Sequence, residues 1–318
     1  MMKKISLIAR IVFGLVILVA LVYHVQSSED LLKVLTHARV EFLTLGFCAF
    51  IFHYFTVYLR WRYVLNGVGK MQITNSVILK SLFGGSAMGL ITPGRLGELG
   101  KGVFFEKSLF WRISGLSIID KGYAHVASII LGVTSFIMIG QERIGIWNGF
   151  PYLLNILLAL LVLIGFIAIF RPRLFALLLA RLSHYLPHRM ASLLAPLIEN
   201  LNHLSRKNSF TLAILSLLVN LSTFLEFYII LNAFVYVTPG EIFWAFEAAF
   251  LAVSFFPFSF SDIGIREGMR IFFLGLFGIS AAAVLNASLL MFMINALIPA
   301  GLGLIAISRM KIFFGNNL

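Results

Sequence analysis

The chain has 318 residues, of which 60% are hydrophobic and only 12% are charged, and its mean hydropathy is +0.98. These values exclude a soluble protein folded around one core in water and indicate an integral membrane protein. The formal net charge of +12 does not indicate nucleic-acid binding, because the basic residues lie between apolar stretches rather than along an aromatic soluble face. The single cysteine, Cys48, excludes an internal disulfide and a cysteine-based metal site.

Six apolar stretches reach the length of about 20 residues that a helix needs to cross a bilayer. They lie near residues 5–25, 41–65, 115–140, 150–170, 210–237 and 283–307. Basic residues precede the first stretch, but it runs to Val25 and no small-residue cleavage site follows. We therefore predict a retained helix rather than a signal peptide.

The basic segments between the spans predict the topology, because such segments face the cytoplasm. They are Lys3 to Arg10, Arg60 to Lys70, Arg171 to Lys207, and Arg309 with Lys311. Residues 27–30 are mixed to acidic, which suits the outside. The sequence thus predicts a multi-pass protein of the cytoplasmic (inner) membrane with both termini in the cytoplasm.

The stretch from 74 to 111 must begin and end on one side of the membrane if the next two spans are to finish at the basic Arg171. Residues 75–91 are barely long enough to span and contain Lys80, which at the membrane centre costs about 2.5–3.5 kcal/mol. Residues 95–112 carry six charged side chains, too many for a lipid-facing crossing. We predict a re-entrant hairpin with its tip at Pro93-Gly94.

The stretch 241–280 is subject to the same constraint from the opposite side. Its first arm, 242–256, has about 15 residues and includes Glu247, so it is short for a core roughly 30 Å thick. A second re-entrant hairpin with its tip at 257–264 satisfies the constraint. Two full crossings in place of each hairpin also satisfy it, and that alternative stays open.

The predicted fold class is therefore an all-α polytopic membrane protein with about six full spans and two re-entrant helical hairpins in an inverted repeat. The chain forms a single membrane domain, 1–318, with inverted halves at about 41–140 and 210–307. The halves are joined by the span 150–170 and by a basic segment, 171–209. We expect this segment to form amphipathic helices on anionic lipid at the cytoplasmic face; a solvated basic loop is the alternative.

The two breaks in the apolar pattern carry charged and hydroxyl residues suited to an anionic head group. Thr92 followed by Pro93 is typical of a helix N-cap with proline at the first helical position, and an arm that starts there directs its positive end into the protein. Glu98 is three residues from both Arg95 and Lys101, close enough to pair with either on a helix.

In the second break, Ser259, Ser261 and Asp262 begin an arm on which Glu267 and Arg270 share a face. We expect Arg95 and Arg266 to contact a phosphate, and Glu98 and Glu267 to position them or a cationic head group. The alternative is that both breaks only cap helices, with their ion pairs at the membrane surface. The predicted substrate-binding residues are Thr92, Arg95, Glu98, Lys101, Ser259, Asp262, Arg266, Glu267 and Arg270, and the predicted structural breaks are Pro93, Gly94, Gly97, Pro257, Gly264 and Gly268.

Four further polar residues in apolar surroundings are secondary candidates: Lys80, Asp120, Lys121 and Glu226. Asp120 and Lys121 open the span at 115–140 and either face a cavity or pair at the interface. Glu226 lies inside the span at 210–237, where a neutral carboxyl or an interhelical hydrogen bond is as reasonable as a substrate contact. His53, near Arg60, is interpreted as interfacial packing.

The motifs of nucleotide binding, zinc proteases and serine hydrolases are absent from the sequence. We therefore predict no catalytic residues, no metal site and no cofactor, and ATP-driven transport by this chain alone is not expected.

Three motifs together resemble the lysylphosphatidylglycerol synthase transmembrane (flippase-like) family, and the resemblance covers nearly the whole chain. They are Thr92-Pro93-Gly94-Arg95-Leu96-Gly97-Glu98, Asp120-Lys121, and Phe256-Pro257 through Gly264-Ile265-Arg266-Glu267-Gly268. The resemblance implies a membrane module that moves aminoacylated phosphatidylglycerol between leaflets while a separate soluble domain makes it. Because the sequence stops at Leu318, directly after its last span, we expect the aminoacyl-transferase domain and synthase activity to be absent.

The expected function is a lipid flippase that moves an anionic or aminoacylated phospholipid, or a polyprenyl-linked glycolipid, across the membrane. One alternative is a membrane-embedded lipid-modifying enzyme that uses Glu98 and Glu267 as acid and base. Another is a non-transporting partner that recruits a cytoplasmic lipid-synthesising enzyme through the segment 171–209. The lipid, the direction and energy source of transport and the oligomeric state stay open.

Overall fold

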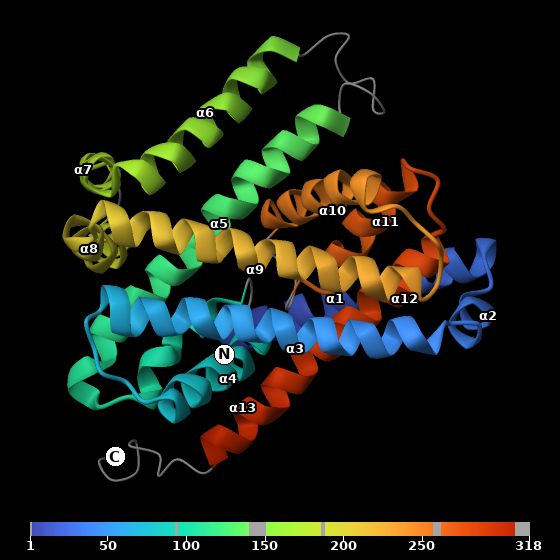
Figure 1. Ribbon diagram of the computed structural model, residues 1–318, viewed down its shortest axis with the longest axis horizontal. Helices are drawn as coiled ribbons and strands as arrows, with labels where there is room; N and C mark the ends of the chain where they lie inside the picture. The colour runs from blue at the N-terminus through green and yellow to red at the C-terminus, as the bar shows by residue number, and fades with distance from the viewer. Residues whose placement is uncertain (1, 93–94, 140–150, 186–187, 257–261, 309–318) are drawn as a thin grey trace.

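The computed structural model describes residues 2–92, 95–139, 151–185, 188–256 and 262–308, and every regular element in these ranges is helical (Figure 1). The first half contains α1 (Met2–Ser28), α2 (Leu31–Thr36), α3 (Val40–Arg62) with its π-helical continuation η1 (Tyr63–Val68), α4 (Asn75–Leu90), the 3-10 segments η2 (Leu96–Phe104) and η3 (Lys107–Leu109), and α5 (Phe110–Ile139). The middle contains α6 (Pro151–Phe170), α7 (Pro172–Ser183) and α8 (His188–His203). The second half contains α9 (Arg206–Asn232), α10 (Pro239–Ser254), α11 (Ile265–Gly275), α12 (Ala281–Phe292), the π-helical η6 (Met293–Leu297) and α13 (Ile298–Ser308).

Four helical stretches within the described residues have the length and apolar composition of membrane spans. They are Val40–Val68, Lys107–Ile139, Arg206–Asn232 and Ala281–Ser308, which coincide with four predicted spans. The bent pair of α6 and α7 is a fifth candidate, and the described apolar part of α1, Gly14–Ser27, is shorter than a span. The all-helical, multi-pass character is confirmed, with four or five capable helices where the sequence predicts six spans.

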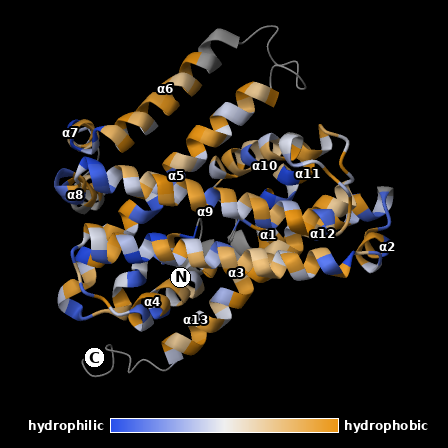
Figure 2. Ribbon diagram, viewed as in Figure 1, coloured by the Kyte–Doolittle hydropathy of each residue, from blue (hydrophilic) through white to orange (hydrophobic). Residues whose placement is uncertain are grey.

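The bend between α6 and α7 measures 119° and has a local cause. Pro172 at the start of α7 has no N–H to continue α6, and Arg171 before it has φ −136° and ψ 60°, outside the helical region. α7 packs against α8, and hydrophilic residues gather on these two helices at one end of the molecule (Figure 2). Leu174 and Leu178 are exposed while Ala176 is buried, a two-sided pattern typical of a helix along a membrane surface.

The two halves of the chain pack reciprocally. The helices α3 and α9 run side by side, α4 packs against α13, and α10 packs against α5 (Figure 1). A glycine lies at each of these contacts, and a Cβ there would meet the neighbouring helix: Gly46 at 2.7 Å from Ile230, Gly303 at 2.1 Å from the Phe83 carbonyl, and Gly132 at 2.5 Å from Leu251. Small residues at the contacts let helices approach closely in a membrane, where burial of apolar surface gives little driving force.

Candidate functional site

The first break folds as a tight antiparallel hairpin of α4 and η2. A Cβ on Gly97 would lie 2.1 Å from the Met88 carbonyl oxygen, and one on Gly85 would lie 2.8 Å from the Lys101 side chain. Residue numbers increase along η2 while those of its neighbours on α4 decrease, so the two segments are antiparallel. The turn is closed by the Thr92 hydroxyl, which accepts the Gly97 N–H at 2.6 Å.

The prediction that Thr92 caps a second helix starting at Pro93 is wrong. The residue before η2 is Arg95, whose φ of 55° lies in the left-handed region, and η2 is a 3-10 segment rather than an α-helix. A left-handed residue cannot continue a helix, so the second arm starts only at Leu96. The hydroxyl of Thr92 instead donates back to the end of α4 while it accepts from η2. Pro93 and Gly94 lie outside the described residues.

Asp120 on α5 joins two buried cations. Its carboxylate lies 2.8 Å from Arg60 Nε on α3 and 3.2 Å from Lys101 Nζ on η2, and all three residues are at most 5% exposed. Lys101 Nζ also lies 4.2 Å from the centre of the Trp61 ring. Of the two cations predicted to be close enough to pair with Glu98, Lys101 instead forms its salt bridge with Asp120 on α5. Three helical segments are held together by this one carboxylate.

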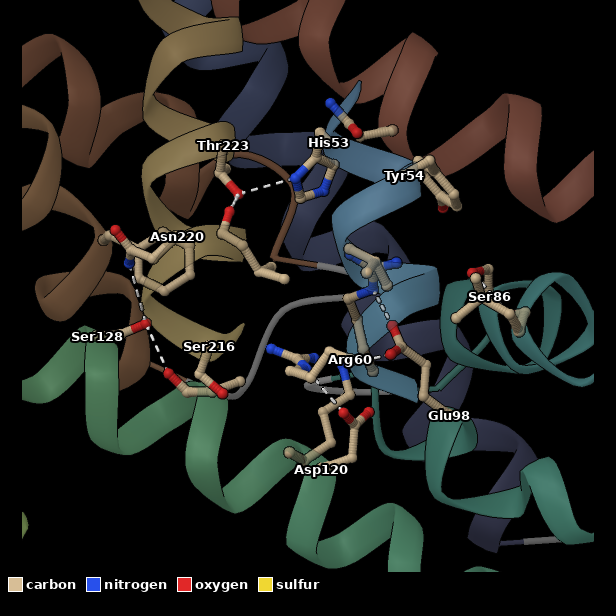
Figure 3. A pocket seen from close by; sticks show the side chains of 18 of the residues that line it. His53, Tyr54, Arg60, Ser86, Glu98, Asp120, Ser128, Ser216, Asn220 and Thr223 are labelled. Atoms are coloured by element: carbon tan, nitrogen blue, oxygen red, sulfur yellow. Dashed lines mark hydrogen bonds and ion pairs between the residues drawn. The ribbon is translucent and has the colours of Figure 1, made fainter. Parts of the chain in front are cut away.

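Glu98 is the second bridging carboxylate. It lies 2.7 Å from Arg95 Nε, which confirms the predicted proximity of these two residues, and it also forms an ion pair with Lys121 on α5. Asp120 thus pairs with Lys101 of η2, and Lys121 pairs with Glu98 of η2. Figure 3 shows Arg60, Glu98 and Asp120 together on one side of the site.

The second break also contains a charged residue in the left-handed region, since Asp262 has φ 61°, and Gly264 follows with φ 83°. α11 then begins, and the Glu267 carboxylate accepts the Gly264 N–H at 2.7 Å. The same carboxylate accepts from Arg266 at 2.6 and 3.0 Å. The Glu267 carboxylate is therefore engaged by Gly264 and Arg266 at the start of α11. Although Glu267 and Arg270 lie on the same face of the helix, they do not form an ion pair. Pro257 and Ser259 lie outside the described residues.

Arg270 is a buried cation that forms no salt bridge with a carboxylate in the described part of the chain. The residue is 5% exposed, and its guanidinium lies 4.6 Å from the Phe227 ring centre and 5.1 Å from that of Phe246. Its Nη1 atom has no hydrogen-bond partner, and among the described residues no carboxylate forms a salt bridge with it. A buried, unpaired guanidinium is costly, so this arrangement favours an anionic ligand.

Two adjoining cavities, of about 250 Å³ and 350 Å³, lie between the breaks. Both are lined by Arg95 and Lys121 of the first half and by Phe250, Arg266 and Arg270 of the second. Six cations line the two cavities, against three carboxylates: Arg60, Arg95, Lys101, Lys121, Arg266 and Arg270 against Glu98, Asp120 and Asp262. Because the lining cations outnumber the lining carboxylates, the cavities have a surplus of positive charge.

The structure places the remaining candidates in different surroundings. Lys80 is exposed and lines neither cavity. Gly268 faces Leu21 of α1, with a nearest distance of 3.6 Å from a Cβ placed on the glycine. Glu226 is fully buried behind the wall of the smaller cavity, next to Asn295.

Several cavity residues have no counterpart among the sequence candidates. Arg60 is buried, and His53, interpreted as interfacial packing, instead lines the smaller cavity with its Nδ1 3.0 Å from the Ser222 hydroxyl. Asn220 and Asn295 line the same cavity (Figure 3 shows Asn220). In the sequence, these residues are recognisable only as polar side chains within an apolar span, a pattern that is often functional.

Comparison of the chain with curated proteins and with solved structures gave no match. One family model, described as the lysylphosphatidylglycerol synthase TM region, matches residues 7–303 and confirms the resemblance seen in the motifs. This range includes both breaks and all the helices that line the two cavities. The chain therefore belongs to the family of the lysylphosphatidylglycerol synthase transmembrane region.

Proposed function

We propose that the protein transports a membrane lipid and binds the phosphate of its head group in the two cavities. Membership of the family supports a role linked to membrane lipids. The observation that carries the proposal is Arg270, a buried guanidinium that has no carboxylate partner among the described residues and faces the same cavities as Arg95 and Arg266. One phosphate would thus meet arginines from both breaks.

The charges around these arginines suit reversible binding of an anion. Arg95 is held by Glu98, and Arg266 is held by Glu267, so both guanidinium groups are fixed in place before a ligand arrives. Arg270 is held between aromatic rings, and its Nη1 is left without a hydrogen-bond partner. A charge-assisted hydrogen bond to phosphate contributes about 1.5–3 kcal/mol, and the fork of an arginine matches phosphate oxygens.

We further propose that α4 with η2 and α10 with α11 are re-entrant hairpins that enter from opposite faces, in inverted halves of one membrane domain. The reciprocal packing of each hairpin helix on the last span of the other half supports this arrangement. So does the left-handed charged residue in each break, Arg95 and Asp262. Transport then follows from alternating access to a site between the two tips. In this arrangement the protein lies in the cytoplasmic membrane with both termini inside, and α7 and α8 rest on anionic lipid.

The test is translocation of phosphatidylglycerol with a fluorescent acyl chain in proteoliposomes. We expect the wild type to move the lipid between leaflets and Arg270→Gln to slow it at least about tenfold, the loss of one charge-assisted hydrogen bond. Arg173→Gln, at an exposed arginine of α7, is the matched control and should leave the rate unchanged. A rate for Arg270→Gln equal to that of the wild type would contradict the assignment.

The same vesicles test the enzymatic alternative. Glu98 and Glu267, its acid and base, are both engaged in ion pairs, an arrangement that suits positioning rather than proton transfer. Mass spectra of the lipid should therefore be identical before and after translocation. A new lipid species that depends on Glu98 or Glu267 would favour an enzyme.

A further inference from the structure

Two carboxyl groups are buried behind the cavity wall and form no salt bridge with any described residue. Glu226 on α9 and Glu247 on α10 are both 0% exposed. Among the described residues, neither forms a salt bridge with a lysine, an arginine or a histidine. An ionised carboxylate in such an apolar site is expensive, and ionisable residues within a membrane protein are usually functional.

Each of these carboxyls is paired with an asparagine in the same way. Glu226 Oε1 accepts from Asn295 Nδ2 at 2.5 Å, and Glu247 Oε2 accepts from Asn220 Nδ2 at 3.2 Å. The second carboxyl oxygen and the amide oxygen of each pair are buried and have no hydrogen-bond partner. The two pairs, which lie on different helices, therefore leave the same atoms unsatisfied.

The unsatisfied atoms are all oxygens that lack a hydrogen-bond donor. A carboxylate oxygen and an amide oxygen only accept hydrogen bonds, so each pair lacks a single donor. A proton on the free carboxyl oxygen provides an O–H group that donates to the amide oxygen and closes a ring of two hydrogen bonds. Protonation thus satisfies all four orphaned oxygens and removes the buried charges, whereas leaving them unpaired costs about 1–3 kcal/mol each.

We propose that Glu226 and Glu247 are proton-binding sites, each shared with its asparagine, and that the protein moves protons together with the lipid. The coupling rests on the proposed function; the proton sites themselves do not. Asn220 and Asn295 line the smaller cavity, so each carboxyl is one side chain away from its contents. Asn295 also lies in the π-helical turn η6, and such interruptions of α-helices are frequent at functional sites.

Arg270 provides the link between proton and lipid, because its guanidinium lies 4.6 Å from the ring centre of Phe227, the residue after Glu226, and the two charged groups are near enough to interact electrostatically. When Glu226 releases its proton to cavity water, the carboxylate competes with a phosphate for Arg270. When Glu226 takes up a proton from that water, Arg270 is free to bind the phosphate. Proton and lipid thus bind together, as in a symporter. The proton that the Glu226 carboxyl oxygen takes up from cavity water is the one that it later releases to cavity water.

No other charged group that lines the described part of the cavities takes the place of Arg270 beside Glu226. On the packed helices, the titratable groups that line the two cavities are His53, Tyr54 and Arg60 of α3, Asp120, Lys121 and His125 of α5, and Arg266 and Arg270 of α11, where Glu267 pairs with Arg266. α6, α12 and η6 contribute no charged residue. Lys121, Arg60 and Arg266 already have carboxylate partners, which leaves Arg270 as the cation that Glu226 influences.

Glutamine is the most informative substitution, because its amide keeps both hydrogen bonds to the asparagine but does not ionise. We expect the double variant Glu226→Gln, Glu247→Gln to fold like the wild type. Its infrared spectrum in detergent at neutral pH should lose the C=O stretching band of neutral carboxylic acids, which the wild type shows. Glu199→Gln, at an exposed residue of α8, is the control and should keep the band. A wild type without the band, or a double variant that retains it in full, would overturn the proton sites.

Coupling is tested with fluorescent phosphatidylglycerol and an imposed pH gradient. For each coupled proton, one unit of gradient should shift the leaflet distribution of the lipid about tenfold in the wild type, and not in the double variant. Wild-type translocation that ignores the gradient overturns the coupling and leaves the proposed function intact. A wild type that moves no lipid overturns both, and the infrared band then decides the proton sites alone.

Discussion

Replacing Asp120 by asparagine removes the carboxylate that serves Arg60 and Lys101 while keeping the volume of the side chain. Both cations are at most 5% exposed and would be left without a counter-ion. Breaking a buried ion pair from one side costs about 3–5 kcal/mol, because the remaining charge is uncompensated. The Trp61 ring 4.2 Å from Lys101 Nζ offsets a part of this, about 0.5–2 kcal/mol. We expect Asp120→Asn to lower the free energy of unfolding by about 3 kcal/mol.

The assay is denaturant unfolding of the purified protein in detergent micelles, with the free energy taken from the midpoint and slope. A second substitution, Lys101→Met, should restore about 1–3 kcal/mol to the Asp120→Asn protein, since it removes one of the two stranded charges. Lys80→Met, at an exposed lysine, is the matched control and should change stability by less than about 0.5 kcal/mol.

Two results would refute the reasoning. Stability of Asp120→Asn within about 0.5 kcal/mol of the wild type would mean that the buried cations need no counter-ion. A double variant no more stable than Asp120→Asn would mean that Lys101 is not the stranded charge.

Two further predictions concern the hairpin turn and the start of α12. Gly97→Ala should destabilise the protein by about 1–3 kcal/mol in the same unfolding assay, since its Cβ would lie 2.1 Å from the Met88 carbonyl. Gly100→Ala, where the nearest atom is 3.4 Å away, should be tolerated. Burial raises the pKa of the Glu29 carboxyl, but hydrogen bonds from Ser280 and from backbone N–H groups of α12 outweigh it and hold that pKa below its usual value. Glu29→Gln should therefore cost about 0.5–2 kcal/mol at pH 7, with a deficit that disappears as the pH falls through the lowered pKa; a deficit independent of pH would contradict this.

The sequence predicts most of the helical framework and the position of both breaks because these depend on local signals. Apolar stretches longer than a bilayer core identify the spans, and proline with glycine marks the interruptions. The contact between Arg95 and Glu98 is predictable for the same reason, since three residues separate them.

The cavity itself depends on contacts between distant segments, which no local pattern encodes. Arg60 and Asp120 are 60 residues apart, and Asn220 and Glu247 are 27 residues apart. Helix packing decides which polar groups meet. The close approach of Gly97 to α4, where a Cβ would lie 2.1 Å from the Met88 carbonyl oxygen, is likewise a contact between separate segments.

Native mass spectrometry of the purified protein tests most directly whether a lipid phosphate is bound between the breaks. With phosphatidylglycerol and diacylglycerol supplied at equal concentration, the wild type should retain the phosphate-bearing lipid and not the diacylglycerol. Arg270→Gln should lower the affinity for phosphatidylglycerol about tenfold to a hundredfold, the loss of one charge-assisted hydrogen bond, while Arg173→Gln should bind as the wild type does. Equal retention of the two lipids, or unchanged affinity in Arg270→Gln, would contradict the account.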